Sequence, residues 1–259
     1  MKNTKTISII GLAGFPSVKK GDNLAELIVK TAQKQGVSIE DRDILVVAQK
    51  IVSKAEGRVF QLKNVKPSER AKKLAMTTRK DPKFVEQVLQ ATRKIVKASS
   101  EILIVENENG IVCINAGIDK SNVEGEDSYA FLPRDSDDSA RGIRQKIREL
   151  TGKNVAVIVS DTYSRPFRKG QVEFAIGMAG ITPFRDYRGE KDLYNYVLKV
   201  KNIAVVDEIA AAAELVMGQG SEGIPVAIIK NLDSAELTEK CSINDIFISK
   251  QEDLFKGTL

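Results

Sequence analysis

A short, continuous apolar run, NVAVIVSDT at residues 154–162, constrains the fold more than any other stretch of the chain. An uninterrupted apolar run of this length predicts a β-strand. Weaker runs predict further strands at residues 6–12, 43–49, 102–106, 110–115 and 224–230. The turn Asn107–Gly110 lies between two of these runs and predicts a β-hairpin.

Helices are predicted where apolar residues recur at helical spacing beside a capping residue. Asp22 is expected to cap a helix that ends at Gly36. Asp81 and Pro82 are expected to open a helix that continues to about residue 97.

Two more helices are predicted, over residues 136–151 and over the alanine-rich segment 208–218, which Asp207 is expected to cap. Because strands and helices mix without strict alternation, we predict an α+β fold. The polar, turn-rich segment 125–139 is a candidate loop or domain boundary.

The length and charge of the chain restrict its class. Its 259 residues suffice for one large domain or two small ones. No apolar run approaches the ~18 residues of a membrane span, and the first one breaks at Gly11, too early for a signal peptide. We therefore expect a cytoplasmic protein without a membrane span. Its net charge of +5 and aromatic content of 5% do not favour nucleic acid as a partner.

The absence of histidine removes several kinds of catalytic site. Ser-His-Asp and Cys-His catalysis are excluded, and so is zinc bound by histidine. The two cysteines, Cys113 and Cys241, do not make a disulfide framework or a zinc site. Metal chemistry would rest on oxygen ligands, which favour hard cations such as Mg²⁺, Mn²⁺ or Ca²⁺.

Acidic residues stand at the ends of three predicted elements. Asp119 and Asn122 follow one strand, Asp161 and Thr162 end another, and Asp207 begins a helix. An acid beside a hydroxyl at a strand end is half of a ligand shell for a hard cation. The alternative for each acid is a helix cap or a turn residue, and for Asp207 the cap is the better interpretation.

Cations follow the second of these acids. Arg165, Arg168 and Lys169 come within eight residues of Asp161. Acid and cations side by side are expected where a polyanion lies between them, as in phosphoryl-transfer sites. We therefore predict that Asp161 binds a metal ion and that the basic loop faces anionic substrates.

The segment GQGSEG, residues 218–223, matches the glycine pattern of dinucleotide-binding proteins. That pattern requires a strand before it and a helix after it, whereas here a predicted helix precedes it and a predicted strand follows. A Rossmann interpretation is therefore rejected. Two interpretations stay open: an ordinary helix-to-strand turn, or a loop that wraps a phosphate with its N–H groups.

Five motifs together resemble the coenzyme F420-0:γ-glutamyl ligase family. They are IVSKAEGR at 51–58, INAGIDKSN at 114–122, VSDTYSRPFRKG at 159–170, AIGMAGITPFRDYRGEKDLY at 175–194 and VVDEIAAAAELVMGQGSEGIP at 205–225. The resemblance extends from about Ile9 to Asn231. The tail, residues 232–259, carries no motif.

The resemblance implies a ligase that uses GTP to join L-glutamate to coenzyme F420-0 by an amide (γ-glutamyl) bond through an acyl phosphate. It implies Mg²⁺ or Mn²⁺, with help from K⁺. It also implies a fold of the family's own α+β type, with mixed, largely antiparallel sheets and flanking helices, in a butterfly-shaped homodimer. Residues 1–259 would form one catalytic unit with room for two subdomains.

The resemblance also implies roles for individual residues. The metal positions fall on Asp119, Asp161, Thr162 and Gln219, where some members carry a glutamate at the last. The nucleotide positions are Phe15, Pro16, Ser17, Val18, Gln49, Lys50, Lys54, Asn122, Gly218, Gly220, Ser221, Glu222 and Gly223. We assign catalysis to Asp119, Asp161, Arg165 and Arg168, and expect the two arginines to bind F420-0 or the acyl phosphate.

Two alternatives to this function stay open. The same chemistry could act on another carboxylate acceptor, such as a folate, because no motif defines the acceptor pocket. A non-catalytic homologue would bind GTP without turnover, although the presence of Asp119, Asp161 and Lys54 argues against it.

Overall fold

The computed structural model describes residues 5–233, 235–249 and 251–253, which form two compact units. The first unit contains Asp22–Val52, Asp135–Ile248 and the described residues up to Val18. The second contains Lys19–Gly21, Ser53–Arg134 and the described residues after Ile248. One boundary, between Arg134 and Asp135, falls inside the polar segment 125–139 that was a candidate boundary.

The first unit is built on a five-stranded sheet with the order β1-β12-β2-β8-β9. Its strands are β1 (Ser8–Gly11), β2 (Ile44–Ala48), β8 (Ala156–Arg165), β9 (Arg168–Ala179) and β12 (Val226–Lys230). Only β2 and β8 pair in parallel among these neighbours, and the other pairs are antiparallel. The predicted strands at 6–12, 43–49, 154–162 and 224–230 are therefore confirmed.

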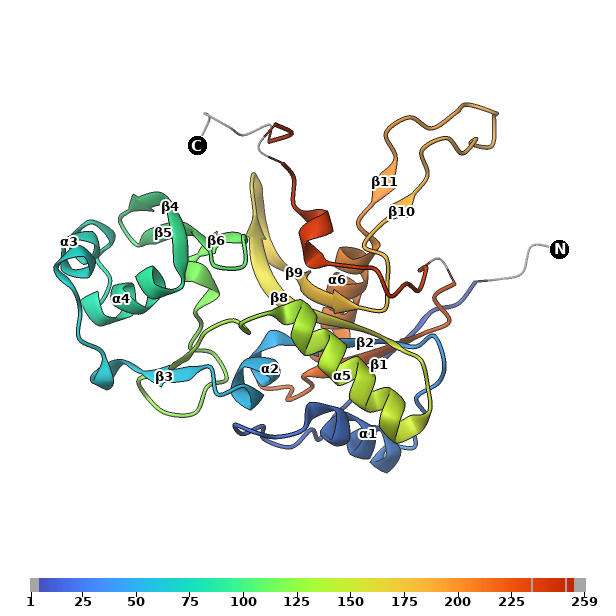
Figure 1. Ribbon diagram of the computed structural model, residues 1–259, viewed down its shortest axis with the longest axis horizontal. Coiled ribbons are helices and arrows are strands. Elements are labelled where there is room, and N and C mark those ends of the chain that lie inside the picture. Colours follow the sequence, from blue (N-terminus) through green and yellow to red (C-terminus); the bar gives the residue numbers. More distant parts are fainter. Residues whose placement is uncertain (1–4, 234, 250, 254–259) are drawn as a thin grey trace. The chain divides into compact units, whose positions relative to one another are not determined.

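Helices cover both faces of this sheet (Figure 1). On one face, α1 (Leu24–Lys34) packs on α5 (Ser136–Thr151), which contacts β8 and β9. On the other face lies α6 (Val205–Met217). Because side chains alternate along a strand, Ala156 and Ile158 lie on the same face of β8, and they share a buried cluster with Ile209 of α6. This buried cluster fixes α6, and the loop that follows it, to the sheet.

The remaining elements of the first unit are short. The helix α2 (Gln49–Ala55) begins directly after β2 and continues into the second unit. A two-stranded ribbon joins β10 (Arg185–Asp186) to β11 (Asn202–Ile203), and η3 (Ile243–Ile246) is a 3₁₀ turn.

The tail, residues 232–259, is tied to α5 although it carries no motif. The buried Asp137 carboxylate accepts the Ser242 hydroxyl at 2.9 Å and the Ile243 N–H at 3.0 Å. It also accepts the Met178 N–H of β9 at 2.8 Å. Residues 234, 250 and 254–259 of this tail lie outside the described residues, as do residues 1–4.

The second unit combines two helices with small antiparallel sheets. Its helices are α3 (Glu69–Thr78) and α4 (Pro82–Gln90), and its three-stranded sheet has the order β4 (Thr92–Ser99), β5 (Ile102–Asn107) and β6 (Val112–Ile114). A second pair joins β3 (Val59–Gln61) to β7 (Ser128–Ala130), with 3₁₀ turns η1 (Leu62–Asn64) and η2 (Asn115–Gly117) nearby in the sequence. Pairing of β5 with β6 confirms the predicted hairpin.

The predicted start of α1 and the predicted end of α4 are wrong. The cap of α1 is Asn23 instead of Asp22. Asp81 does cap α4, but the helix ends at Gln90, and the residues expected to continue it form β4. The β-branched residues after Gln90 favour a strand, and β5 offers that strand a partner.

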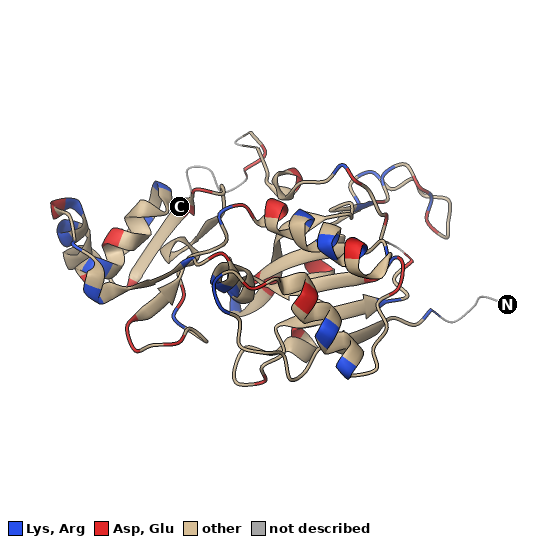
Figure 2. Cartoon of the chain, turned by 60° about the horizontal axis from the view of Figure 1, so that its bottom comes forward, with Lys and Arg blue, Asp and Glu red and all other residues tan. Residues whose placement is uncertain are grey.

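The class of the fold agrees with the prediction: a mixed α+β chain with mostly antiparallel pairing. Within the described residues, no helix is long and apolar enough to cross a membrane. Basic and acidic side chains are interspersed along the helices of both units (Figure 2).

Candidate functional site at one edge of the five-stranded sheet

Strand direction brings four predicted binding segments to one edge of the sheet in the first unit. Because β1, β2 and β8 run in the same direction, their carboxyl ends meet at this edge, where the oppositely directed β12 begins. Residues 15–18 follow β1, Gln49 and Lys50 follow β2, and residues 218–225 precede β12. The carboxyl ends of parallel strands are where ligands bind in many α/β sheets.

Hydrogen bonds hold these segments at that edge. The Leu12 N–H, at the end of β1, donates to the Val226 carbonyl at 2.9 Å. The Ala48 N–H, at the end of β2, donates to the Pro225 carbonyl at 2.9 Å. The glycine segment therefore begins the strand that lies between β1 and β2.

The strand β8 does not end at Asp161 and Thr162, as the sequence predicted. It continues to Arg165 and returns as β9, because residues 161–165 pair with β9. The neighbouring β2 ends opposite Ser160, and among the described residues no strand pairs with β8 beyond that point on the β2 side. Asp161 and Thr162 thus lie at the point where one edge of β8 becomes open.

Arg165 and Arg168 flank the exposed turn between β8 and β9. Arg165 lies four positions along the strand from Asp161, which corresponds to about 13 Å. The predicted cations are therefore displaced along the hairpin from the acid, and their contact with anionic substrates stays a prediction.

Asp161 is a half-buried carboxyl with a strongly raised pKa. Burial is the main cause, the nearby Glu173 carboxylate adds to it, and together they raise the pKa to about 7. The Thr162 N–H, the Lys50 ammonium and the Tyr163 hydroxyl act in the opposite direction and lower this pKa. A bound cation would relieve this electrostatic cost, because it favours the carboxylate over the acid.

Sequence reasoning missed Glu173. This residue is 3% exposed on β9, and its carboxylate accepts hydrogen bonds from Ser160 Oγ at 2.7 Å, Thr162 Oγ1 at 2.7 Å and Gln219 Nε2 at 3.1 Å. Burial raises the pKa of Glu173, and these three donors act against that shift. A glutamate inside the otherwise apolar segment VEFAIGMA was the available signal.

Thr162 and Gln219, two of the predicted metal residues, are therefore brought together by the structure. Asp161 and Thr162 are consecutive strand residues, so their side chains leave β8 on opposite faces. Binding of one cation by both side chains at the open edge of β8 stays a prediction.

The glycine segment contains an internal anion. The Glu222 carboxylate accepts the Gly220 N–H at 2.8 Å. Gly218 and Gly223 have φ angles of 67° and 65°, a backbone region that favours glycine. The segment thus offers an N–H to a carboxylate here, which supports the interpretation that it also suits a phosphate oxygen.

Asp207 has a different role from the predicted cap. The N-cap residue of α6 is Ala204, so Asp207 lies inside the first turn. Its Oδ1 accepts the Ala175 N–H of β9 at 3.0 Å, beside the register shift of that strand. Burial raises its pKa. Asp207 therefore satisfies an amide of the sheet.

The other predicted residues lie in the second unit. Asp119 forms a bridge with Ala130, and its carboxylate accepts the Ser121 N–H at 3.0 Å and the Ser121 hydroxyl. Asn122 has a φ angle of 54° in the exposed turn that follows. Lys54 lies in the last turn of α2. A shared site for Asp119 and Asp161 stays a prediction.

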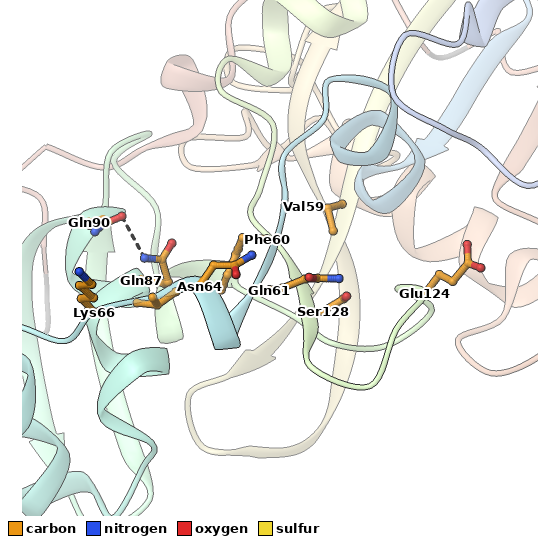
Figure 3. A pocket seen from close by; sticks show the side chains of 10 residues that line it. Val59, Phe60, Gln61, Asn64, Lys66, Gln87, Gln90, Glu124 and Ser128 are labelled. Atoms are coloured by element: carbon orange, nitrogen blue, oxygen red, sulfur yellow. Dashed lines mark hydrogen bonds between the residues drawn. The ribbon is translucent and has the colours of Figure 1, made fainter.

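A pocket of about 630 Å³ also lies in the second unit (Figure 3). The side-chain amides of Gln61, Asn64, Gln87 and Gln90 line it, and Lys66 and Glu124 lie toward its opposite ends. None of the predicted site residues is among its lining residues.

The donor atoms at the sheet edge fit a hard cation. The described residues contain no cluster of three or more His, Cys, Asp or Glu side chains that could hold a metal ion. The edge instead combines the Asp161 carboxylate with a hydroxyl and an amide oxygen. Mg²⁺ and Mn²⁺ suit such a partial oxygen shell, because Mg²⁺ usually keeps several waters and takes substrate phosphates as further ligands.

The raised pKa of Asp161 predicts a pH-dependent stability in the absence of metal. Between the ordinary carboxyl pKa and about 7, the folded state binds more protons at Asp161 than the unfolded state, so stability falls as pH rises. We expect Asp161→Asn in chelator to raise Tm little at pH 5 and clearly at pH 8. Thermal denaturation across this range checks it, and a pH-independent difference would contradict it.

The sequence of the chain is similar to one protein family and to several named proteins of that family. The model of the F420-0:gamma-glutamyl ligase family matches residues 14–231. A coenzyme F420:L-glutamate ligase of Methanothermobacter thermautotrophicus is 44% identical over 97% of this chain and 99% of its own length. Proteins of the same name from Archaeoglobus fulgidus and Methanocaldococcus jannaschii are 43% and 42% identical, over 98% and 99% of this chain and 98% and 100% of their own lengths.

Proposed function

Because the chain belongs to the F420-0:gamma-glutamyl ligase family and is a ligase that forms carbon–nitrogen bonds, we propose that it joins L-glutamate to coenzyme F420-0 with GTP as co-substrate. The observation that carries this proposal is the meeting of residues 15–18, Gln49 with Lys50, Asp161 with Thr162, and residues 218–225 at one edge of a sheet. These segments supply ammonium, backbone N–H, carboxylate and hydroxyl groups, as a metal–nucleotide complex requires.

The reaction proceeds in two steps. A carboxylate oxygen of F420-0 attacks the γ-phosphorus of GTP, which forms an acyl phosphate and releases GDP. The amine of glutamate then attacks the acyl carbon, phosphate leaves with the electron pair of the broken C–O bond, and the amine loses a proton to give the amide. Because three anionic reactants must meet, neutralisation of charge and positioning carry most of the catalysis.

Different residues of the chain are assigned to phosphate binding, metal binding and substrate binding. Lys50 and Lys54 supply positive charge toward the phosphates, and the glycine segment supplies N–H donors. Asp161, Thr162 and Gln219, with Asp119 from the second unit, would hold Mg²⁺ or Mn²⁺. When bound, the cation neutralises phosphate charge. We assign Arg165 and Arg168 to F420-0 or the acyl phosphate, K⁺ to a supporting role, and the active assembly to a homodimer.

The test is phosphate release from GTP with Mn²⁺ and L-glutamate, with and without F420-0, followed by the mass of the product. We expect release that depends on F420-0 and a product heavier by one or more glutamyl units. Nucleotide binding without release would indicate a non-catalytic protein. Release that depends on a folate in place of F420-0 would indicate a different acceptor. Either result contradicts the proposal.

A further inference from the structure

We propose that Glu173 is a positioning residue that turns Gln219 and Thr162 toward the cation. This inference rests on the proposed function, because it concerns the same metal site. Glu173 has no part in the proposed catalytic roles. Its carboxylate is 3% exposed and accepts hydrogen bonds from residues of β8 and of the glycine segment.

The contacts separate the two oxygens of Glu173 by function. Oε2 accepts from Thr162 Oγ1 at 2.7 Å and from Gln219 Nε2 at 3.1 Å, and both donors are predicted metal residues. Oε1 accepts from Ser160 Oγ at 2.7 Å. Ser160 is fully buried and is not a predicted ligand. Oε2 therefore contacts the predicted metal residues, whereas Oε1 contacts only a buried residue of the core.

The donor direction decides what the two site residues present outward. A side-chain amide that donates its NH₂ to Glu173 has its oxygen on the other branch, as an acceptor directed away from that carboxylate. A hydroxyl that donates its hydrogen to Glu173 keeps its lone pairs for another partner. Both groups thus present oxygen acceptors, as a hard cation requires. Outer partners that orient ligands in this way are a general feature of metal sites.

The same geometry explains why an amide suits position 219. A carboxylate there would have no hydrogen to donate to Glu173 and would repel it, and Asp161 already adds negative charge nearby. Gln219 instead supplies a donor toward Glu173 and an oxygen toward the site. The hydrogen bond between these residues therefore has a required direction, with Gln219 as the donor and Glu173 as the acceptor.

The experiment measures Mn²⁺ affinity directly, from the electron paramagnetic resonance signal of free Mn²⁺ in the presence of a non-hydrolysable GTP analogue. In Glu173→Gln the side chain keeps nearly the same shape, but it loses the negative charge and presents one oxygen acceptor and one NH₂ to three donors. We expect its Mn²⁺ affinity to fall about 10- to 100-fold. Unchanged affinity in this variant, with normal binding by the wild type, overturns the inference.

Ser160→Ala is the matched control, because it removes the hydrogen bond to Oε1 and leaves both bonds to Oε2. We expect it to lower Tm while its Mn²⁺ affinity stays within about 3-fold of the wild type. If Ser160→Ala loses as much affinity as Glu173→Gln, then Glu173 acts only through the stability of the core, and the inference is wrong.

A swap of the pair supplies a rescue. Glu173→Gln combined with Gln219→Glu restores one donor and one carboxylate with their direction reversed, and it is expected to recover most of the lost affinity. No recovery contradicts a directional pair. If Glu173→Gln alone does not fold, the test uses Gln219→Met, a change in an exposed loop. Unchanged Mn²⁺ affinity in Gln219→Met overturns the inference. A wild type that holds no Mn²⁺ with nucleotide would instead refute the metal site of the proposed function.

Discussion

Replacement of Asp161 by asparagine is expected to lower kcat/KM at least about 100-fold, because it removes the negative charge that would hold the cation against the nucleotide phosphates. The carboxyl is half-buried, and burial and Glu173 raise its pKa to about 7, so its anionic form is unfavourable without the positive charge of a cation. The same change removes that electrostatic cost, so the metal-free variant should be more stable at pH 8. Activity and stability are thus expected to move in opposite directions.

Asp138→Asn is a suitable control for this prediction. Asp138 lies in the first turn of α5, its side chain is 71% exposed, and it pairs with Arg141. A surface ion pair of this kind contributes little, so kcat/KM is expected to stay within about 2-fold. Steady-state kinetics at saturating Mn²⁺ measure both variants. Equal activity of Asp161→Asn and wild type would remove Asp161 from the site.

Gly177→Ala is expected to destabilise the first unit by about 3 kcal/mol. A β-carbon on Gly177 would lie 2.5 Å from the Ser136 carbonyl oxygen and as close to other Ser136 atoms, so α5 or β9 must move. The obstacle is backbone, which yields less easily than a flexible side chain. The next residue, Met178, donates its N–H to Asp137, so movement there also strains the bond that ties β9 to α5.

Gly142→Ala provides the opposite control. Gly142 lies inside α5, is exposed, and has no atom within 4 Å of the added β-carbon. Alanine should stabilise the helix there by about 0.5–1 kcal/mol. Urea denaturation of both variants tests the pair of predictions. A Gly177→Ala protein as stable as the wild type would show that the contact between α5 and β9 is loose.

Local pattern located part of the fold, but α2, α3 and β9 were not predicted. Continuous apolar runs located β2, β8 and β12, and helical spacing with Gly152 after it located α5 to the residue. The end of α4 was missed because Ala91 and Ile95 fit the helical spacing, while the choice of a strand depends on β5, a partner that no local pattern shows.

The site was predictable in its parts but not in its assembly. Motif order located Asp161, Thr162 and the glycine segment, and sheet topology then placed them at one edge. Glu173 was not predicted, because its importance arises from partners on β8 and in a loop 46 residues away. Asp207 resembled a cap by position, yet the amide it satisfies belongs to β9.

We propose an activation of the F420-0 carboxylate as an acyl phosphate before glutamate attacks. Its most direct test is a single turnover with F420-0 labelled with ¹⁸O in that carboxylate, GTP, Mn²⁺ and L-glutamate, with mass analysis of both products. We expect a glutamylated F420 and inorganic phosphate that carries one ¹⁸O atom. Glutamylated product with unlabelled phosphate, or labelled substrate left unchanged while GTP is consumed, would contradict it.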